Sequence, residues 1–410
     1  MDLTLSNGLR VICIEKKNVP IISCIVYYKC GSDDDAISKS GVAHYLEHMA
    51  FFNNKCEFSD FLEGIGAEFN AFTSNQLICF EEVVPTEHIE TVLKHESMRM
   101  GEFDIDIEKF KSEKGAILEE RSMRTDNYPD GQYSELENAY IFNRIPIIGW
   151  RNEIESITPN DLVKFRNKWF APNNAVIFLT GDIDVANIKS LVKKYFEKIP
   201  SKNIVRTKKN KDKPKNTKVI EFKSSKIGTL ACANYTYFVP QTINKNFRKK
   251  MAAELAFAVL NQSKSMFKNT LEHSFNIANK IHFVYDHTSN IFDTLEIELQ
   301  CSSIDNLYKS EDVLKYLLEK ILCNGISETE LNIVKRQNAL ADAYKKEDIA
   351  TISFLMVNYF ANGYSLEEIQ KMDDVIQSIN AKECNDILCE ILKSSPIAIS
   401  RMLPKEHDSD

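Results

Sequence analysis

The sequence predicts a two-domain protein in which each of two similar halves combines β-strands with α-helices. Its 410 residues exceed the roughly 100–200 residues of one domain, so two well-buried cores are expected. The order of elements predicted for the first half returns in the second, without a clear residue-level repeat. A lysine-rich stretch at the midpoint, residues 203–218, is more typical of a solvated linker than of a binding surface. We therefore expect an internal duplication, with domains at residues 1–202 and 219–410.

The first half begins with strands and continues with helices. Residues 3–14 and 21–28 are rich in Ile, Val and Tyr, which favour strands, and Asn7-Gly8 marks a turn. A threonine before proline, with an acid three residues later, is typical of a capped helix start. Helices are predicted at residues 41–52, 58–66 and 86–124 and after Thr158-Pro159-Asn160-Asp161, strands at 69–84 and 175–180, and a polar break at 125–131.

The second half repeats this order after the linker. Strand-like stretches come first, long helical patterns follow, and an extended segment closes the chain. Strands are predicted at residues 218–222, 228–238 and 397–402, and helices at 249–260, 311–322, 328–343 and 366–370.

Composition excludes several classes of protein. The chain has 51 basic and 59 acidic residues and a net charge of −8, so it offers no basic surface for nucleic acid. It has no apolar run of the ~18 residues that a membrane span needs, and we expect a soluble protein. Its 10 cysteines form no Cys-x-x-Cys pair, which favours buried thiols in a reducing compartment. With no signal segment, cytoplasm or an organelle matrix is expected, and the periplasm if the sequence is trimmed.

One cluster carries chemistry, His44-Tyr45-Leu46-Glu47-His48. Residues four apart lie on one helix face, so His44 and His48 can bind the same ion while Glu47 projects beside them. Two imidazoles and one further carboxylate make a three-ligand zinc site with an open position for water. This order of residues is the inverzincin signature. The alternative is a helix with two incidental histidines.

The third ligand should be an acid on another helix. Glu113 and Glu120 are seven residues apart, two turns along one helix face, so both can point to the same site. One could bind zinc while the other holds a ligating histidine by a hydrogen bond. A solvated charged face is the alternative interpretation of this pair.

Together these motifs resemble the pitrilysin-type inverzincin metallopeptidases, in particular the short bacterial branch related to the mitochondrial processing peptidase β subunit. The resemblance covers nearly the whole chain. It rests on Ser6-Asn7-Gly8-Leu9-Arg10-Val11, Gly31-Ser32, residues 40–48, 70–74 and 113–124, Ile148-Gly149-Trp150, and residues 169–174 and 181–182.

The resemblance implies the fold and the ligand set. The fold is α+β, with two duplicated domains that each have a mostly antiparallel sheet and helices on one face. The pair forms one half of a clam-shell that a second subunit closes. One Zn²⁺ per chain is expected, bound by His44, His48 and Glu120, with Glu113 orienting a ligand.

The implied activity is hydrolysis of peptide bonds in peptides or unfolded polypeptides. Glu47 is expected to act as the general base for a zinc-activated water. Asn70-Ala71-Phe72-Thr73 resembles the family's substrate strand, which would pair with an extended peptide through backbone hydrogen bonds. Phe72 could instead pack in the core.

The sequence departs from the family at the substrate clamp. Active members often carry an Arg followed seven residues later by a Tyr in the second domain, where this chain has Glu272 and Asn279. We therefore expect a heterodimer, in which a homologous partner carries the clamp and this chain carries zinc; a homodimer is the alternative. The competing functions are a non-catalytic structural subunit and a zinc-dependent module that binds peptides without cutting them.

Overall fold

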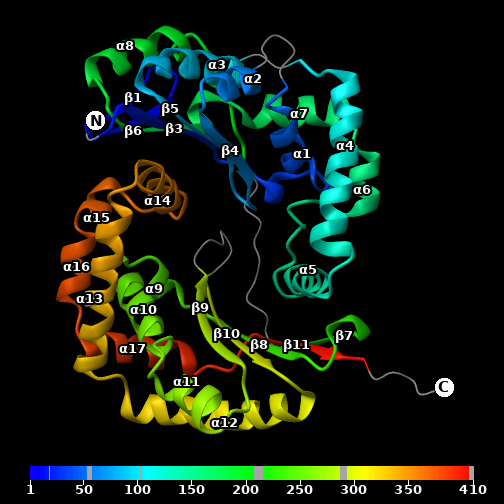
Figure 1. Cartoon of the computed structure of the whole chain (residues 1–410), viewed down its shortest axis with the longest axis vertical. Helices are drawn as coiled ribbons and strands as arrows, with labels where there is room; N and C mark the ends of the chain where they lie inside the picture. The colour runs from blue at the N-terminus through cyan, green and yellow to red at the C-terminus, as the bar shows by residue number, and fades with distance from the viewer. Residues whose placement is uncertain (18, 53–57, 102–103, 207–215, 287–292, 406–410) are drawn as a thin grey trace. The chain divides into compact units, whose positions relative to one another are not determined.

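The computed structural model describes residues 1–17, 19–52, 58–101, 104–206, 216–286 and 293–405 (Figure 1). The chain forms two compact units that exchange segments. Unit 1 comprises Met1–Asn127, Asn143–Lys208 and Tyr344–Ala361, and unit 2 comprises Tyr128–Phe142, Lys209–Ala343 and Asn362–Asp410. The division at residues 1–202 and 219–410 stays a prediction about the duplicated halves, and residues 207–215 of the predicted linker lie outside the described residues.

Unit 1 is built on a six-stranded sheet with the order β1-β2-β6-β3-β5-β4. The strands are β1 (Asp2–Thr4), β2 (Arg10–Glu15), β3 (Ile21–Tyr28), β4 (Glu68–Thr73), β5 (Ile78–Pro85) and β6 (Ala175–Gly181). The helices are α1 (Val42–Met49), α2 (Phe58–Gly64), α3 (Ile89–Gly101), α4 (Ile107–Arg121), α6 (Arg151–Ser156), α7 (Pro159–Trp169), α8 (Val185–Phe196) and α14 (Ile349–Ala361). Strands β2 and β6 pair in parallel, and the other neighbours pair antiparallel.

Unit 2 is built on a five-stranded sheet with the order β7-β11-β8-β10-β9. The strands are β7 (Lys218–Ser224), β8 (Ala231–Phe238), β9 (Lys280–Asp286), β10 (Thr294–Cys301) and β11 (Ala398–Pro404). The helices are α5 (Pro129–Phe142), α9 (Gln241–Asn244), α10 (Phe247–Leu260), α11 (Met266–Lys268), α12 (Ile304–Asn324), α13 (Glu328–Lys345), α15 (Leu366–Gln370), α16 (Met372–Ser378) and α17 (Ala381–Leu392).

The two sheets share one topology. Setting β1 aside, each sheet places its first strand beside its last, in parallel, and then its second, fourth and third strands, all antiparallel. Thus β2 to β6 correspond in order to β7 to β11. The predicted α+β class with mostly antiparallel sheets is confirmed, and the shared order supports the predicted duplication.

Both faces of the first sheet are covered, which adds to the single helical layer that we expected. Alternate residues of β3 face a core formed with helices that include α1, α3 and α7. The intervening Tyr27 stacks on Phe178 of β6, and Phe178 meets Phe360 of α14 edge-on at 5.2 Å. Helix α14 therefore covers the second face, although its residues come from the other half of the chain.

The first half supplies α5 to unit 2 in return. Helix α5 contacts β7 and β11, and its Tyr133 hydroxyl donates a hydrogen bond to Ser400 Oγ at 2.9 Å. Glu137 of α5 accepts hydrogen bonds from Ser400 Oγ and from Asn234 Nδ2 of β8. The exchange was not predicted, because nothing local in a helix sequence identifies which sheet it packs on.

Several elements differ from the sequence prediction, and strands β9 and β10 and helices α6, α8, α16 and α17 were not predicted. The pattern at 86–124 is two helices, α3 and α4, because Asp106 caps a new helix by accepting hydrogen bonds from the backbone N–H groups of Glu108 and Lys109. Helix α5 begins inside the predicted polar break, and α14 was not predicted. The predicted capping box at Thr158 and Asp161 is confirmed.

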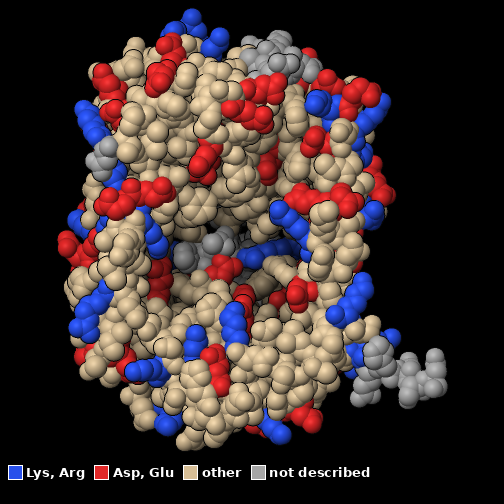
Figure 2. Space-filling view, viewed as in Figure 1, with Lys and Arg blue, Asp and Glu red and all other residues tan. Residues whose placement is uncertain are grey.

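The distribution of surface charge and the state of the cysteines agree with what the composition predicted. Acidic and basic side chains are interspersed over the face that Figure 2 shows, which offers no broad basic surface. The described cysteines are all free thiols, most of them buried. Within the described ranges, no helix combines the length and apolarity that crossing a membrane requires.

Candidate metal centre

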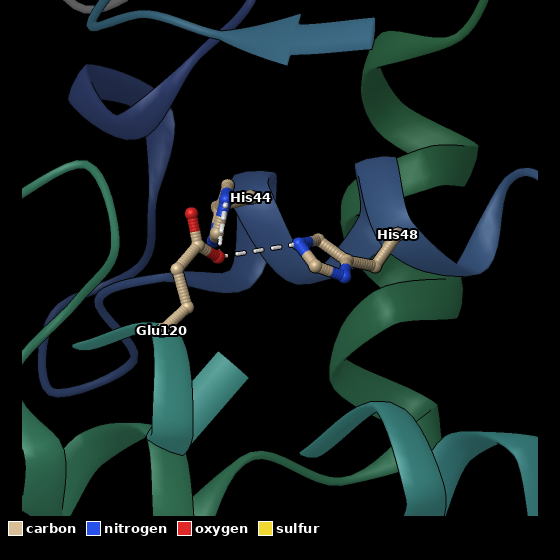
Figure 3. Close-up of side chains that lie close together, drawn as sticks. All are labelled: His44, His48 and Glu120. Atoms are coloured by element: carbon tan, nitrogen blue, oxygen red, sulfur yellow. Dashed lines mark ion pairs between the residues drawn. The ribbon is translucent and has the colours of Figure 1, made fainter. Parts of the chain in front are cut away.

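Three predicted ligands converge in unit 1. His44 and His48 lie on the same face of α1, and Glu120 lies near the end of α4 (Figure 3). Glu120 Oε2 is 3.6 Å from the Nε2 atoms of both histidines. Ligand atoms about 2.1 Å from a tetrahedral zinc ion would lie about 3.4 Å from one another, close to both of these distances, and the ligand atoms of the three residues all lie within 4.8 Å of one another. No other such cluster of His, Cys, Asp and Glu occurs among the described residues.

The protonation of the two histidines is set by different neighbours. Burial, and then the nearby charge of His48, lowers the pKa of His44 to about 4, so this ring is neutral and can offer a lone pair. Burial alone would lower the pKa of His48, but hydrogen bonds to Glu120 and Glu113 outweigh it and raise that pKa. The hydrogen bond with His48 keeps the pKa of Glu120 below its usual value.

Two of the three predicted ligands, His48 and Glu120, are each held by a charged neighbour. Glu113 Oε2 lies 3.0 Å from His48 Nδ1, which leaves His48 Nε2 directed at Glu120. Arg124, in the π-helical segment Ser122–Asp126, pairs with Glu120 Oε1 at 3.0 Å and leaves Oε2 for the histidines. The predicted role of Glu113 fits this contact. Arg124 was not identified from the sequence as part of the site.

The candidate base lies beside the ligands. Glu47 is 8% exposed, and its Oε2 accepts a 2.5 Å hydrogen bond from Thr73 Oγ1 at the end of β4. Burial raises the pKa of the Glu47 carboxyl, an effect that the Thr73 hydrogen bond partly opposes. A carboxylate with a raised pKa is a better proton acceptor, which suits a general base.

The start of α1 is fixed by close backbone contacts. The Asp35 carboxylate accepts hydrogen bonds from Gly41 N at 2.7 Å and Ala43 N at 2.9 Å, which caps the helix. Gly41 and Gly149 both have φ of +90° and lie against each other, and a Cβ at Gly149 would come within 2.4 Å of Ser40 O. Only glycine fits at this contact. The backbone at the start of α1, in residues 40–48, is therefore held in place by close contact with the loop at 148–150.

The same loop orients α4. Arg121, the residue after Glu120, donates a hydrogen bond to Gly149 O and pairs with Asp126 at 3.1 Å. Tyr45 of α1 stacks on Phe110 of α4 with ring centroids 4.8 Å apart. These contacts join the two helices that carry the ligands. A sequence signal for these contacts was present, because Gly149 and Arg121 both lie in the stretches at 148–150 and 113–124 that carry the family resemblance.

The four predicted substrate residues form one edge of the first sheet. Asn70, Ala71, Phe72 and Thr73 lie on β4, the last strand in the sheet order. The half-buried Phe72 ring packs edge-on against the exposed Phe354 of α14, with centroids 5.8 Å apart, and is not part of the buried core of the unit. As the edge strand, β4 has a strand neighbour on one side only within the described sheet.

The positions of the missing clamp lie in unit 2. Glu272 belongs to the π-helical segment Asn269–Ser274, and its Oε1 accepts a hydrogen bond from Ile281 N at 2.8 Å. Asn279 precedes β9, and its backbone N–H donates to Gln300 O at 2.7 Å. Neither side chain supplies the positive charge of an arginine.

Comparison with protein families assigns a model to each half. Residues 10–143 match the model described as insulinase (peptidase family M16), and residues 156–338 match the model described as the peptidase M16 inactive domain. The predicted ligands and base all lie in the first range. The two matches together span most of the chain.

Named relatives are similar to about half of this chain. Zinc protease PqqE of Helicobacter pylori is 30% identical over 207 residues, which are 48% of this chain and 47% of that protein. The uncharacterized zinc protease YmxG of Bacillus subtilis is 28% identical over 200 residues, 47% of this chain and 49% of that protein. The matched region thus spans about half the length of these curated relatives.

Solved structures share the fold over the full chain. A protease from Helicobacter pylori superposes with a TM-score of 0.87 at 22% identity, covering 99% of both chains. A peptidase M16 inactive domain from Pseudomonas fluorescens gives 0.85 at 16% identity, covering 100% of this chain and 99% of that one. The periplasmic protease PqqL of Escherichia coli gives 0.81 at 18% identity, and the match covers 100% of this chain but 48% of PqqL.

Proposed function

The chain belongs to peptidase family M16, and from this membership we propose that it is a zinc-dependent endopeptidase or oligopeptidase acting on extended peptides. His44, His48 and Glu120 are the proposed zinc ligands, and Glu47 is the proposed general base. The observation that carries the proposal is the convergence of His44 Nε2, His48 Nε2 and Glu120 Oε2, with the buried Glu47 carboxylate on the same helix.

The proposed chemistry divides between the ion and the chain. Zinc, when bound, lowers the pKa of a coordinated water and polarises a peptide carbonyl. Glu47 accepts the proton of the attacking water and returns it to the leaving amine. Glu113 holds the His48 ring, and Arg124 holds Glu120. The ligand set leaves a position open for a reactant, as a catalytic zinc site does.

An extended backbone is the proposed substrate form. Strand β4 ends the sheet, so a peptide can add to it as a further strand through main-chain hydrogen bonds. Phe72 is already packed against Phe354, which leaves little side-chain recognition on that face. We therefore propose broad selectivity among peptides and unfolded polypeptides.

A homologous partner chain is the proposed completion of the enzyme. Glu272 and Asn279 stand where active relatives carry the clamp, and the match to PqqL covers 48% of that longer chain. We expect the purified chain to have low activity alone and to gain activity with a homologue that carries the Arg and Tyr. Light scattering with a peptide-cleavage assay tests this, and a fully active homodimer would contradict it.

The second candidate is a non-catalytic subunit of a processing complex. The match of residues 156–338 to a model of inactive domains favours it. The intact set of ligands and base argues against it, because a purely structural subunit has no use for an open metal site with a general base.

Zinc content and peptide cleavage, measured together, separate these functions. The full chain is loaded with zinc and assayed on an internally quenched peptide, with and without a chelator. We expect stoichiometric zinc and cleavage that the chelator abolishes. Zinc without cleavage, both in the chain alone and with a homologue that carries the Arg and Tyr, would indicate a peptide-binding or structural subunit. Cleavage that survives the chelator would contradict a zinc mechanism.

Replacing Glu113 is expected to weaken zinc binding. The Glu113→Gln variant loses the carboxylate that faces His48 Nδ1, so the ring is less basic and less well oriented, and zinc affinity should fall about 10- to 100-fold. Competition with a chromogenic chelator measures it. Glu119→Gln, an exposed residue of the same helix, is the matched control and should bind zinc like the wild type. Equal affinities for both variants would show that Glu113 does not support the site.

A further inference from the structure

Thr73 connects the candidate base to the edge of the sheet. Its hydroxyl donates the 2.5 Å hydrogen bond to Glu47 Oε2, and its backbone belongs to β4. A hydrogen bond to a carboxylate at this distance is short and charge-assisted. The contact holds Oε2, one of the two carboxylate oxygens of Glu47, and the Glu47 side chain is buried on α1.

The pairing of β4 with β5 shows which backbone groups face outward. Ser74 N donates to Leu77 O at 2.8 Å, so that pair is hydrogen-bonded across the turn. Antiparallel pairs alternate between bonded and non-bonded, so Thr73 opposite Ile78 is non-bonded and directs its N–H and C=O away from β5.

A second observation agrees with this alternation. Ala71 N donates to the side-chain Oδ1 of Asn70 at 2.9 Å rather than to β5, as expected two residues before Thr73. The outward groups of Ala71 and Thr73 are therefore the pairing sites of the free edge. Asn70 covers one of them with its own amide.

We propose that Thr73 is a positioning residue that orients the Glu47 carboxylate through its hydroxyl and sets the register of a bound peptide through its outward backbone. The inference rests on the proposed function. It makes one residue responsible for placing the scissile bond next to the base. The Thr73 hydroxyl should then affect kcat, whereas the outward backbone groups of β4 should affect the Kd of a bound peptide.

The hydroxyl is tested by two substitutions. In the zinc-loaded full chain, Thr73→Val should lower kcat on an internally quenched peptide about 10- to 100-fold, since a misplaced base loses its alignment, while KM and zinc content stay unchanged. Thr73→Ser keeps the hydroxyl and should recover most of kcat. Thr4→Val, an exposed strand residue at the far edge of the same sheet, is the control.

The backbone is tested by binding without turnover. In a Glu47→Gln background, anisotropy of a fluorescent peptide should give about the same Kd with and without Thr73→Val. Thr73→Pro removes the outward N–H of Thr73 itself and, compared with Thr73→Val, should raise Kd about 10-fold, because an edge strand tolerates proline at an outward position but loses the donor.

Three results would overturn the inference. They are an unchanged kcat in Thr73→Val, a rise in KM alone, or a loss of zinc together with kcat that Thr73→Ser does not restore. Failure of the proposed function is distinct, because then the wild-type chain cleaves no peptide even with its homologous partner, or Glu47→Gln cleaves as well as wild type.

Discussion

The Glu47→Gln variant is expected to bind zinc like the wild-type chain and to lose peptidase activity by about 100- to 10,000-fold. The substitution keeps the shape of the side chain and its contact with Thr73, but an amide cannot accept a proton from water at neutral pH. Because the ligand atoms belong to His44, His48 and Glu120, the metal should stay in place. Zinc content and kcat, measured on the same preparation, check this expectation.

The matched control is Glu63→Gln, which changes an exposed glutamate of α2. It makes the same change of charge in unit 1 and should leave kcat within about twofold of wild type, as surface substitutions usually do. If Glu47→Gln holds zinc and still cleaves peptides at the wild-type rate, Glu47 is not the base and the proposed mechanism is wrong.

Replacing Arg99 by Leu is expected to lower the free energy of unfolding by about 3–5 kcal/mol, the usual cost of removing one partner of a buried ion pair. Arg99 lies on α3 and is 4% exposed. It contacts the buried carboxylates of Glu82, at 3.3 Å, and Glu96, and lies over the Phe80 ring at 4.0 Å. Leucine would leave both acids in the core without a cation.

The loss should depend on pH in a defined direction. Burial and the charge of Glu96 raise the pKa of Glu82, and Arg99 opposes them. Without Arg99 the folded chain binds a proton at Glu82 more tightly than the unfolded chain does, so stability falls as pH rises above the ordinary range of a glutamate. Denaturant unfolding followed by circular dichroism should show a larger loss at pH 8 than at pH 5.

The control for this variant is Arg248→Leu, which breaks an Arg–Glu pair with Glu383 in unit 2. That pair is partly exposed, so its loss should change stability by about 1 kcal/mol or less. Similar losses for Arg99→Leu and Arg248→Leu, or a loss independent of pH, would show that the buried cluster does not act as a charge network.

Local patterns account for what could be predicted. His44, Glu47 and His48 lie within two turns of one helix, so periodicity alone brings them together. Most strands of the two sheets, though not β9 and β10, and the cap at Thr158 also follow from local composition and spacing. The choice of Glu120 over Glu113 as the ligand came from family resemblance, since spacing places both acids on the same helix face.

The features that the sequence did not predict depend on contacts between residues far apart in the chain. The support of α1 by Gly149, the link of Arg121 to the same loop, and the bond of Thr73 to Glu47 join residues far apart in the chain. The exchange of α5 and α14 between the two units is of the same kind.

The sequence by itself identified the candidate metal ligands His44 and His48, because a metal-binding pattern on a helix needs only the 3.6-residue repeat to be recognised. It also determined the α+β class and the duplication. Only the tertiary structure decided how α4 brings Glu120 to the histidines, which oxygen of Glu47 is held, and which backbone groups of β4 face outward. Those features depend on packing and register between distant segments, and no local pattern encodes them.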